Sequence, residues 1–136
     1  PTVPNMIFPN LPVADVARSR EFYTALGFTI NEQFSDENTA SVVISDSIVL
    51  MVMTRARFAE FTKKQIVDAH TSVEVITALG VETRDEVDRL ADAALAAGAT
   101  VGGDTQDHGF MYGRSIDDLD GHRLEFVWMD PSAIAG

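Results

Sequence analysis

The sequence predicts an α+β fold made of two successive βαβββ modules in one domain. The same order of elements, one strand, one helix and three strands, recurs along the 136 residues. Two short segments also recur: Leu11-Pro12-Val13 corresponds to Leu79-Gly80-Val81, and residues 25–30 (ALGFTI) correspond to residues 96–101 (AAGATV). These matches fix one alignment of the halves, so residues 1–136 are interpreted as one domain with an internal repeat.

The N-terminal module is expected at residues 5–53. Its first strand, residues 5–13, contains Pro9 and Pro12 and is expected near a sheet edge. Asp15 is expected to cap a helix that runs to Leu26, and Gly27 to end that helix in a left-handed conformation. Three strands are then expected at residues 28–34, 39–45 and 47–53, the last two joined by a tight turn at Asp46.

Residues 54–72 are expected to form a helical linker, with a helix over 55–69 in which Thr62-Lys63-Lys64-Gln65 has the pattern of a capping box. The C-terminal module is expected at residues 73–130. It begins with a strand at 73–81 and a helix that Thr83 caps and Gly98 ends. Strands are expected at residues 100–106, 110–116 and 122–129, with a turn at 118–121.

Composition narrows the function classes. The net charge of -11, from 21 acidic and 10 basic residues, would repel a phosphate backbone, so nucleic acid is not an expected partner. The acidic charge either keeps the protein soluble or attracts cationic ligands. Without cysteine the chain has no disulfide, thiolate metal site or cysteine nucleophile. No apolar run approaches the length of a membrane span, and the sequence shows no secretory signal. Both observations predict a cytoplasmic protein that does not contact a membrane.

A family resemblance is carried by several short segments: Leu11-Pro12-Val13, Phe22-Tyr23, Leu26-Gly27-Phe28, Asp118-Leu119-Asp120-Gly121-His122 and Glu125. They resemble the vicinal-oxygen-chelate superfamily of glyoxalases, bleomycin-resistance proteins and extradiol dioxygenases. Residues 109–114 and 128–130 are similar to a bacterial subgroup labelled predicted lactoylglutathione lyases. The resemblance implies that each module curls into a half-barrel and that paired halves enclose a cup that can hold a divalent metal.

The resemblance also implies four metal-ligand positions, one on the first and one on the last strand of each module. In this sequence they correspond to Phe8, Met51, Ile76 and Glu125. Only Glu125 is a suitable ligand for the metals of the superfamily, and a catalytic metal usually needs about three protein ligands. We therefore expect no metal site, with Glu125 as the one surviving candidate ligand and a divalent metal as the alternative.

Strand alternation from these four positions predicts a methionine-rich, apolar cup with one carboxylate. Methionine suits pockets that accept several apolar shapes, although the same methionines would also suit a core. Glu125 is the candidate catalytic residue. The candidate ligand-binding residues are Phe8, Asn10, Met51, Met53, Ile76, Tyr112, Arg114 and Arg123.

Glu125 is expected to have a cationic partner, because an unpaired carboxylate in apolar surroundings is costly. If residues 118–121 form a four-residue hairpin loop, Arg114 lies directly opposite Glu125. Three roles for Glu125 stay open: pairing with Arg114, contact with a ligand, and metal ligation.

These expectations favour a protein that binds a small organic molecule, which can be cationic, without metal chemistry. The alternative is a metal-dependent lyase or isomerase of lactoylglutathione lyase type, or a related dioxygenase. A third hypothesis is a structural or regulatory protein with a vestigial cup. The resemblance further implies a homodimer, because modules of this superfamily often pair across chains.

Overall fold

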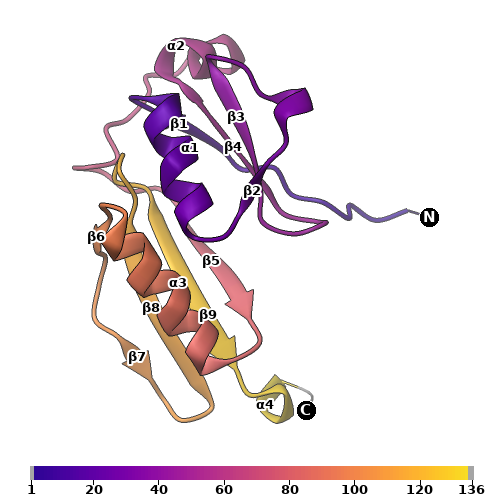
Figure 1. Ribbon diagram of the computed structural model, residues 1–136, viewed down its shortest axis with the longest axis vertical. Helices are drawn as coiled ribbons and strands as arrows, with labels where there is room; N and C mark the ends of the chain where they lie inside the picture. The colour runs from indigo at the N-terminus through magenta and orange to yellow at the C-terminus, as the bar shows by residue number, and fades with distance from the viewer. Residues whose placement is uncertain (1, 135–136) are drawn as a thin grey trace. The chain divides into compact units, whose positions relative to one another are not determined.

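The computed structural model describes residues 2–134, and the chain folds as two compact units, Pro1–Val67 and Asp68–Gly136. Each unit contains one module of the repeat (Figure 1). The first consists of β1 (Asn10–Val13), α1 (Val16–Ala25), β2 (Thr29–Ile30), the 3-10 helix η1 (Glu32–Phe34), β3 (Thr39–Val43) and β4 (Val49–Thr54). Its sheet has the strand order β1-β4-β3-β2, with β1 parallel to β4 and the other pairs antiparallel.

The second module repeats this order. It consists of β5 (Ile76–Val81), α3 (Arg84–Ala96), β6 (Thr100–Val101), β7 (Gln106–Asp107), β8 (Met111–Asp117), β9 (Arg123–Met129) and the short α4 (Pro131–Ile134). The strand order is β5-β9-β8-β6, and β7 adds a short pairing to β8. Within residues 2–134 both sheets are open, so neither closes into a barrel by itself. The predicted α+β fold with two modules is confirmed.

The strand registers confirm the predicted correspondence between the modules. Asn10 pairs with Met51, and Ala78 pairs with Glu125. Met51 therefore occupies the position of Glu125, and Phe8, two residues before Asn10, occupies the position of Ile76. The third strands agree as well, because Ser41 pairs with Met51 and Ser115 with Glu125.

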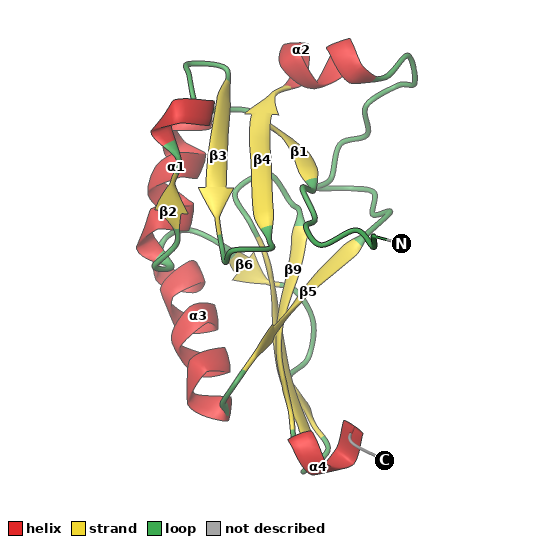
Figure 2. Cartoon of the chain, turned by 90° about the vertical axis from the view of Figure 1, so that its right-hand side faces the viewer, coloured by secondary structure: helices red, strands yellow, loops and turns green. Residues whose placement is uncertain are grey.

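Each helix covers one face of its own sheet (Figure 1), and Figure 2 shows the second sheet nearly edge-on with α3 on one side. In the first module the fully buried side chains include Phe22 and Tyr23 of α1 and Leu50 and Val52 of β4. In the second they include Val87 of α3, Ile116 of β8, and Leu124 and Phe126 of β9. Burying each of the larger apolar side chains stabilises the fold by about 1.5–3 kcal/mol.

The helix ends follow the sequence signals. The Asp15 carboxylate accepts a hydrogen bond from the Arg18 amide (3.1 Å), and Thr83 Oγ1 accepts one from the Glu86 amide (3.1 Å). Gly27 and Gly98, which follow the two helices, have φ values of 98° and 113°. Both caps and both helix-ending glycines were predicted, because each uses a local rule of backbone chemistry.

The linker was predicted less well. The helix α2 (Arg55–Phe58) is followed directly by the 3-10 helix η2 (Ala59–Phe61), and the helical segment ends there. The helix predicted over 55–69 is therefore wrong beyond Phe61. Thr62 Oγ1 accepts from the Lys64 amide at 3.1 Å, which forms a local turn instead of opening a helix. The Arg55 guanidinium donates to the carbonyls of Ile66 and Val67, which attaches the segment after Phe61 to the start of α2.

Several predicted strands are shorter than expected. The strand predicted at 5–13 begins at Asn10, preceded by an isolated bridge at Ile7, and the strand predicted at 39–45 ends at Val43. The strand predicted at 28–34 ends at Ile30 and is followed by η1, the strand predicted at 100–106 is split into β6 and β7, and the strand predicted at 73–81 begins at Ile76. No helix in the described part of the chain is both long and apolar enough to cross a membrane.

Candidate functional site

The candidate residues of the first module lie on the face of its sheet that α1 does not cover. The Ile7 amide donates to the Ser47 carbonyl, just before β4, at 2.9 Å. Two amides of β4 donate to the segment before β1: that of Val49 to the Ile7 carbonyl at 3.1 Å and that of Met51 to the Pro9 carbonyl at 2.8 Å. These bonds continue the register of β1 backwards, so Phe8 and Asn10 point to the same side. The Asn10 side-chain amide donates to the Phe8 carbonyl at 2.8 Å, and the Phe8 ring is 50% exposed.

Met51 and Met53 belong to this same face, because Leu50 and Val52, which alternate with them along β4, are fully buried on the α1 side. Met53 is 3% exposed and Met51 is half-buried. None of the four candidates in this module carries a charge. This face of the first sheet can therefore offer a ligand the apolar side chains of Phe8 and Met51 and the amide of Asn10, whereas Met53 is too deeply buried to contact one.

The second sheet places Ile76, Arg123 and Glu125 on the face opposite α3. Leu124 and Phe126, which alternate with them, are buried on the α3 side. Ile76 pairs with Arg123 in the parallel register and is 55% exposed. We call the side of the second sheet that carries Ile76, Ser115, Asp117, Arg123 and Glu125 the open face.

Arg123 is held firmly on the open face. Its Nε donates to Asp117 Oδ1 at 2.6 Å, and its Nη2 donates to the Gly102 carbonyl at 2.9 Å and to Asp117 Oδ2 at 3.4 Å. The hydrogen bond with Asp117 raises the pKa of Arg123 above its ordinary value, with a smaller contribution from the charge of Glu125. The cation near Glu125 is therefore Arg123, which already has a carboxylate partner.

The predicted pairing of Arg114 with Glu125 is wrong. The last pair before the β8–β9 turn is Asp117 with Arg123, so the loop spans residues 118–122 and is one residue longer than predicted. Ser115 lies opposite Glu125, and Arg114 lies opposite Phe126. Because a shift of one residue moves every side chain to the other face of a strand, Arg114 points to the α3 side.

The longer loop has a clear cause. The Asp118 carboxylate accepts from the amides of Asp120 and His122, both at 2.9 Å, and the Gly121 amide donates to the Asp118 carbonyl at 3.1 Å. Gly121 has a φ of 88°, which L-residues with a side chain rarely adopt. Together these bonds close a loop of five residues. The residue types in the turn do not by themselves predict this length.

Arg114 and Tyr112, two candidate ligand-binding residues, both contact α3. Arg114 Nη1 donates to Asp88 at 3.0 Å and to Asp92 at 2.9 Å, and the Tyr112 hydroxyl donates to Asp88 at 2.6 Å. The Tyr112 hydrogen bond lowers the pKa of Asp88, and the same bond raises the pKa of Tyr112. These two residues therefore do not share a face with Glu125.

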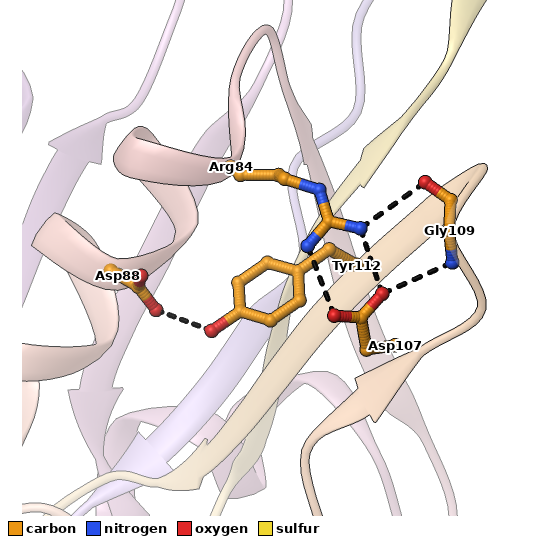
Figure 3. Close-up of polar contacts among 5 residues, drawn as sticks. All are labelled: Arg84, Asp88, Asp107, Gly109 and Tyr112. Carbon is orange, nitrogen blue, oxygen red and sulfur yellow. Dashed lines mark hydrogen bonds and ion pairs between the residues drawn. The ribbon is translucent and has the colours of Figure 1, made fainter.

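A second polar cluster surrounds Arg84 at the start of α3 (Figure 3). Its guanidinium donates to both oxygens of Asp107, at 2.7 and 3.1 Å, and to the Gly109 carbonyl at 3.1 Å. The guanidinium carbon also lies 4.9 Å from the centre of the Tyr112 ring and 5.3 Å from that of Trp128. The Arg84 hydrogen bonds lower the pKa of Asp107 from 3.8 to about 2. This cluster attaches β7 to α3, and we interpret it as structural.

The four positions implied by the superfamily do not fit a divalent metal. Their donor set consists of one carboxylate (Glu125), one thioether (Met51) and two hydrocarbon side chains (Phe8 and Ile76). A thioether is a weak ligand for the hard or borderline divalent ions that use imidazole and carboxylate. Within residues 2–134 no group of three or more histidine, aspartate or glutamate side chains is placed to hold an ion.

The sequence analysis missed Asp117, Ser115 and Gly102, the three residues that define the surroundings of Arg123 and Glu125. The internal repeat carried a signal for one of them, since Ser115 occupies the position of Ser41. Asp117 could have been found only with the correct loop length. Gly102 lies against Arg123 through a contact between distant parts of the chain, for which the local sequence gives no sign.

Comparison with known proteins agrees with this fold. The family "Bleomycin resistance protein-like N-terminal" matches residues 5–45. The hypothetical protein SA1046 from S. aureus is 30% identical with a TM-score of 0.77, over 94% of this chain and 95% of that one. No curated protein matches the chain significantly.

Two further solved structures are less similar in sequence. A glyoxalase-related enzyme from Fulvimarina pelagi is 18% identical with a TM-score of 0.77, over 93% of this chain and 88% of that one. A glyoxalase/bleomycin resistance protein/dioxygenase family enzyme from Burkholderia phytofirmans PsJN is 17% identical with a TM-score of 0.73, over 90% and 96% of the two chains. At these identities the similarity concerns the fold.

Proposed function

The chain belongs to the vicinal-oxygen-chelate superfamily of glyoxalases, bleomycin-resistance proteins and dioxygenases, and from this premise we propose that it binds a small organic molecule bearing a cationic group. One observation carries the proposal. The open face of the second sheet has a carboxylate, Glu125, that remains after its neighbouring cation, Arg123, has been neutralised by Asp117.

The local charge supports a cationic ligand. Arg123 contributes +1, Asp117 -1 and Glu125 -1, so the three groups together carry -1. The net charge of -11 for the whole chain adds a long-range attraction for cations. Because Glu125 is half-buried, its charge is less screened than that of a fully exposed carboxylate.

Apolar groups near Glu125 would contact the rest of the ligand. Ile76, which pairs with Arg123 on the same side of the second sheet, is 55% exposed, and Val127, two residues after Glu125 on β9, is half-buried. Small-molecule sites commonly combine such surfaces with a few polar groups.

We propose that binding does not use a resident metal, because the donor set described above does not fit one. No observation on these residues favours the alternative of a metal-dependent lyase, isomerase or dioxygenase. Metal content measured on protein purified without chelator tests this part. A stoichiometric divalent ion that is lost in Glu125→Gln would overturn it and restore the metalloenzyme.

The experiment for ligand binding compares benzylammonium with benzyl alcohol, which have similar apolar parts and differ in charge. Calorimetric titration of the full chain is expected to show benzylammonium binding about tenfold more tightly, because a charge-assisted hydrogen bond to Glu125 exceeds a neutral one. Glu125→Gln should remove this preference. Glu74→Gln, the same change at an exposed residue of the second unit, should keep it.

Equal affinities for the two ligands in the wild-type protein would contradict the proposal. So would a preference for benzylammonium that survives in Glu125→Gln.

A homodimer is the second part of the proposal and comes from the superfamily resemblance. The strand β5 lies at one end of the strand order of its sheet, and Val73, Val75 and Ile76 in and before it are 72%, 62% and 55% exposed. Pairing of chains is one way to cover such an apolar edge. Light scattering at micromolar concentration tests it, and a monomeric mass would count against it.

A further inference from the structure

Three polar groups on the open face have unused hydrogen-bonding capacity: the Glu125 carboxylate, the Ser115 hydroxyl and Nη1 of Arg123. Within residues 2–134, none of the three has a hydrogen-bond partner. Ser115 is 9% exposed, and its oxygen is not fully enclosed, because no fully enclosed side-chain oxygen or nitrogen of the described residues lacks a partner. The Ser115 hydroxyl is therefore accessible to a ligand, although most of the residue is buried.

The three groups are close together. Ser115 lies directly opposite Glu125 across β8 and β9. Side chains at such paired positions have Cβ atoms about 4.5–5.5 Å apart. Arg123 precedes Glu125 by two residues on β9, so the two side chains share a face at a spacing of about 6.7 Å along the strand. A small molecule of a few carbon atoms can reach all three.

The guanidinium of Arg123 is fixed before any ligand arrives. Asp117 and the Gly102 carbonyl occupy its Nε and Nη2, which leaves Nη1 as the available donor. Gly102 makes this arrangement possible, since a Cβ there would lie 2.7 Å from Arg123 Nε and 2.9 Å from Ser115 Oγ. A fixed donor loses little entropy on binding, which favours recognition.

From this geometry we infer that the open face recognises a zwitterion of the amino acid type, whose cationic group binds Glu125 and whose carboxylate binds Nη1 of Arg123. The inference rests on the proposed function and names its ligand class. The carboxylate of such a ligand adds an ion pair with Arg123, which a ligand with only a positive charge lacks. Ile76, which pairs with Arg123 across β5 and β9, favours an apolar side chain on the ligand.

The first module supplies an internal contrast. The positions of Asp117, Arg123 and Glu125 are occupied there by Val43, Val49 and Met51. Only Ser41, the equivalent of Ser115, keeps a polar side chain at these four positions. The capacity to bind both ends of a zwitterion therefore belongs to the second module.

Three ligands that share a phenylethyl group test the inference on the full chain by calorimetric titration. Phenylalanine carries both charges, 2-phenylethylamine lacks the carboxylate, and 3-phenylpropionate lacks the ammonium group. Phenylalanine is expected to bind about tenfold more tightly than either of the others, because each omits one charge-assisted contact. Ser115→Ala should weaken phenylalanine binding by about threefold to tenfold, because it removes one hydrogen bond to the ligand.

Arg123→Met separates recognition from loss of structure. The change leaves the carboxylates of Asp117 and Glu125 without a nearby cation, so 2-phenylethylamine should bind more tightly than to wild type and phenylalanine more weakly. Opposite shifts for two ligands cannot result from a partly unfolded protein. The matched control Glu74→Gln should change neither affinity.

The outcomes distinguish this inference from the proposed function. If 2-phenylethylamine binds at least as tightly as phenylalanine to the wild-type protein, the zwitterion inference is wrong and the cation-binding proposal stands. If benzylammonium binds but none of the phenylethyl ligands does, the inference is again wrong. If no cationic ligand binds in either experiment, both are overturned.

Discussion

The two modules have the same backbone plan and different chemistry on equivalent faces. Their strands share one register, in which Met51 corresponds to Glu125 and Val49 to Arg123. The face that α1 leaves uncovered is uncharged, whereas the open face of the second sheet carries three ionised side chains. The repeat therefore fixes where side chains project, and the substitution of residues within that plan decides which half can bind a charged ligand.

The faces that the helices cover also differ in charge, and again the second module carries the charged side chain. Ala40, fully buried on β3, occupies the position of Arg114 on β8. The helix α1 has 10 residues and α3 has 13. In the second module the arginine reaches from the sheet to Asp88 and Asp92 of the longer helix, so ion pairs replace part of an apolar contact there.

The turns of the two modules give the largest expected effect. Residues 44–48 and 118–122 occupy the same place, and Ser47 corresponds to Gly121. A Cβ on Gly121 would lie 2.6–2.7 Å from the backbone of Ala69 and His70, at a φ of 88°. Gly121→Ala should therefore lower the free energy of unfolding by about 3 kcal/mol or more, from strain and overlap together.

Urea denaturation measures this change, with Ser47→Ala as the matched control. Ser47 is exposed, and no residue other than glycine in residues 2–134 has a positive φ, so the control should change stability by less than about 0.5 kcal/mol. Equal stability of the two variants would show that the turns are more alike than their glycine content indicates.

Arg114→Ala is expected to have the next largest effect, a loss of about 1–2 kcal/mol. The side chain is 22% exposed, but its partners Asp88 and Asp92 are 45% and 69% exposed, so solvent weakens both ion pairs. Part of the loss is the packing of the aliphatic stem, which Arg114→Met should largely restore. Arg57→Ala, at a more exposed pair in the first unit, should cost less.

The size of this loss also checks the register. If Arg114 were the partner of Glu125 in apolar surroundings, its removal would cost about 3–5 kcal/mol and Arg114→Met would be as damaging as Arg114→Ala. Urea denaturation of the three variants distinguishes the two cases.

Local rules explain why much of the fold could be predicted. The helix caps at Asp15 and Thr83 and the helix-ending glycines Gly27 and Gly98 depend on neighbouring residues alone, and all four lie where the sequence placed them. The alignment of the halves was also correct, because matching segments constrain both modules at once. By contrast, the linker after Phe61 depends on Arg55 contacts that span more than ten residues, and no periodicity reports them.

The candidate site was predicted only in part, for a physical reason. Alternation correctly places Ile76, Arg123 and Glu125 on one face, since it needs only the strand and its buried side. The partner of Glu125 depended on the length of one loop, and an error of one residue moved Arg114 and Tyr112 to the wrong face. The bonds that set this length come from the Asp118 carboxylate, whose rotamer the sequence does not specify.

Tyr112→Phe tests the polar contact between α3 and β8 and should have a smaller effect. It removes the hydrogen bond to Asp88 and keeps the ring beside Arg84, so the loss should be about 0.5–1 kcal/mol, because Asp88 is half-exposed. The pKa of Asp88, which this bond lowers, should rise toward its ordinary value. Carbon-13 NMR titration of the carboxyl group measures it. An unchanged pKa of Asp88 would mean that Arg114 alone stabilises the carboxylate.

The smallest effect on stability is expected from a change at Asp107. This residue lies on β7, a short strand that has no counterpart in the first sheet. The Arg84 hydrogen bonds, and after them that of the Gly109 amide, lower its pKa to about 2 in the folded protein. A carboxyl group with a lowered folded pKa stabilises the fold at pH values above its unfolded pKa, about 3.9, and this contribution disappears as the pH falls through the folded value. The difference in stability between the wild type and Asp107→Asn should therefore be constant above about pH 5, shrink as the pH falls from about 4 to about 2, and vanish below. Both side chains are exposed, so added salt should reduce the difference at every pH.

Hydrogen exchange provides the local measurement: in Asp107→Asn the amides of β7 should exchange faster while those of β9 stay protected. If the β9 amides lose protection to the same degree, Arg84 and Asp107 support the whole second sheet, and β7 is an integral strand of the module instead of an attached one.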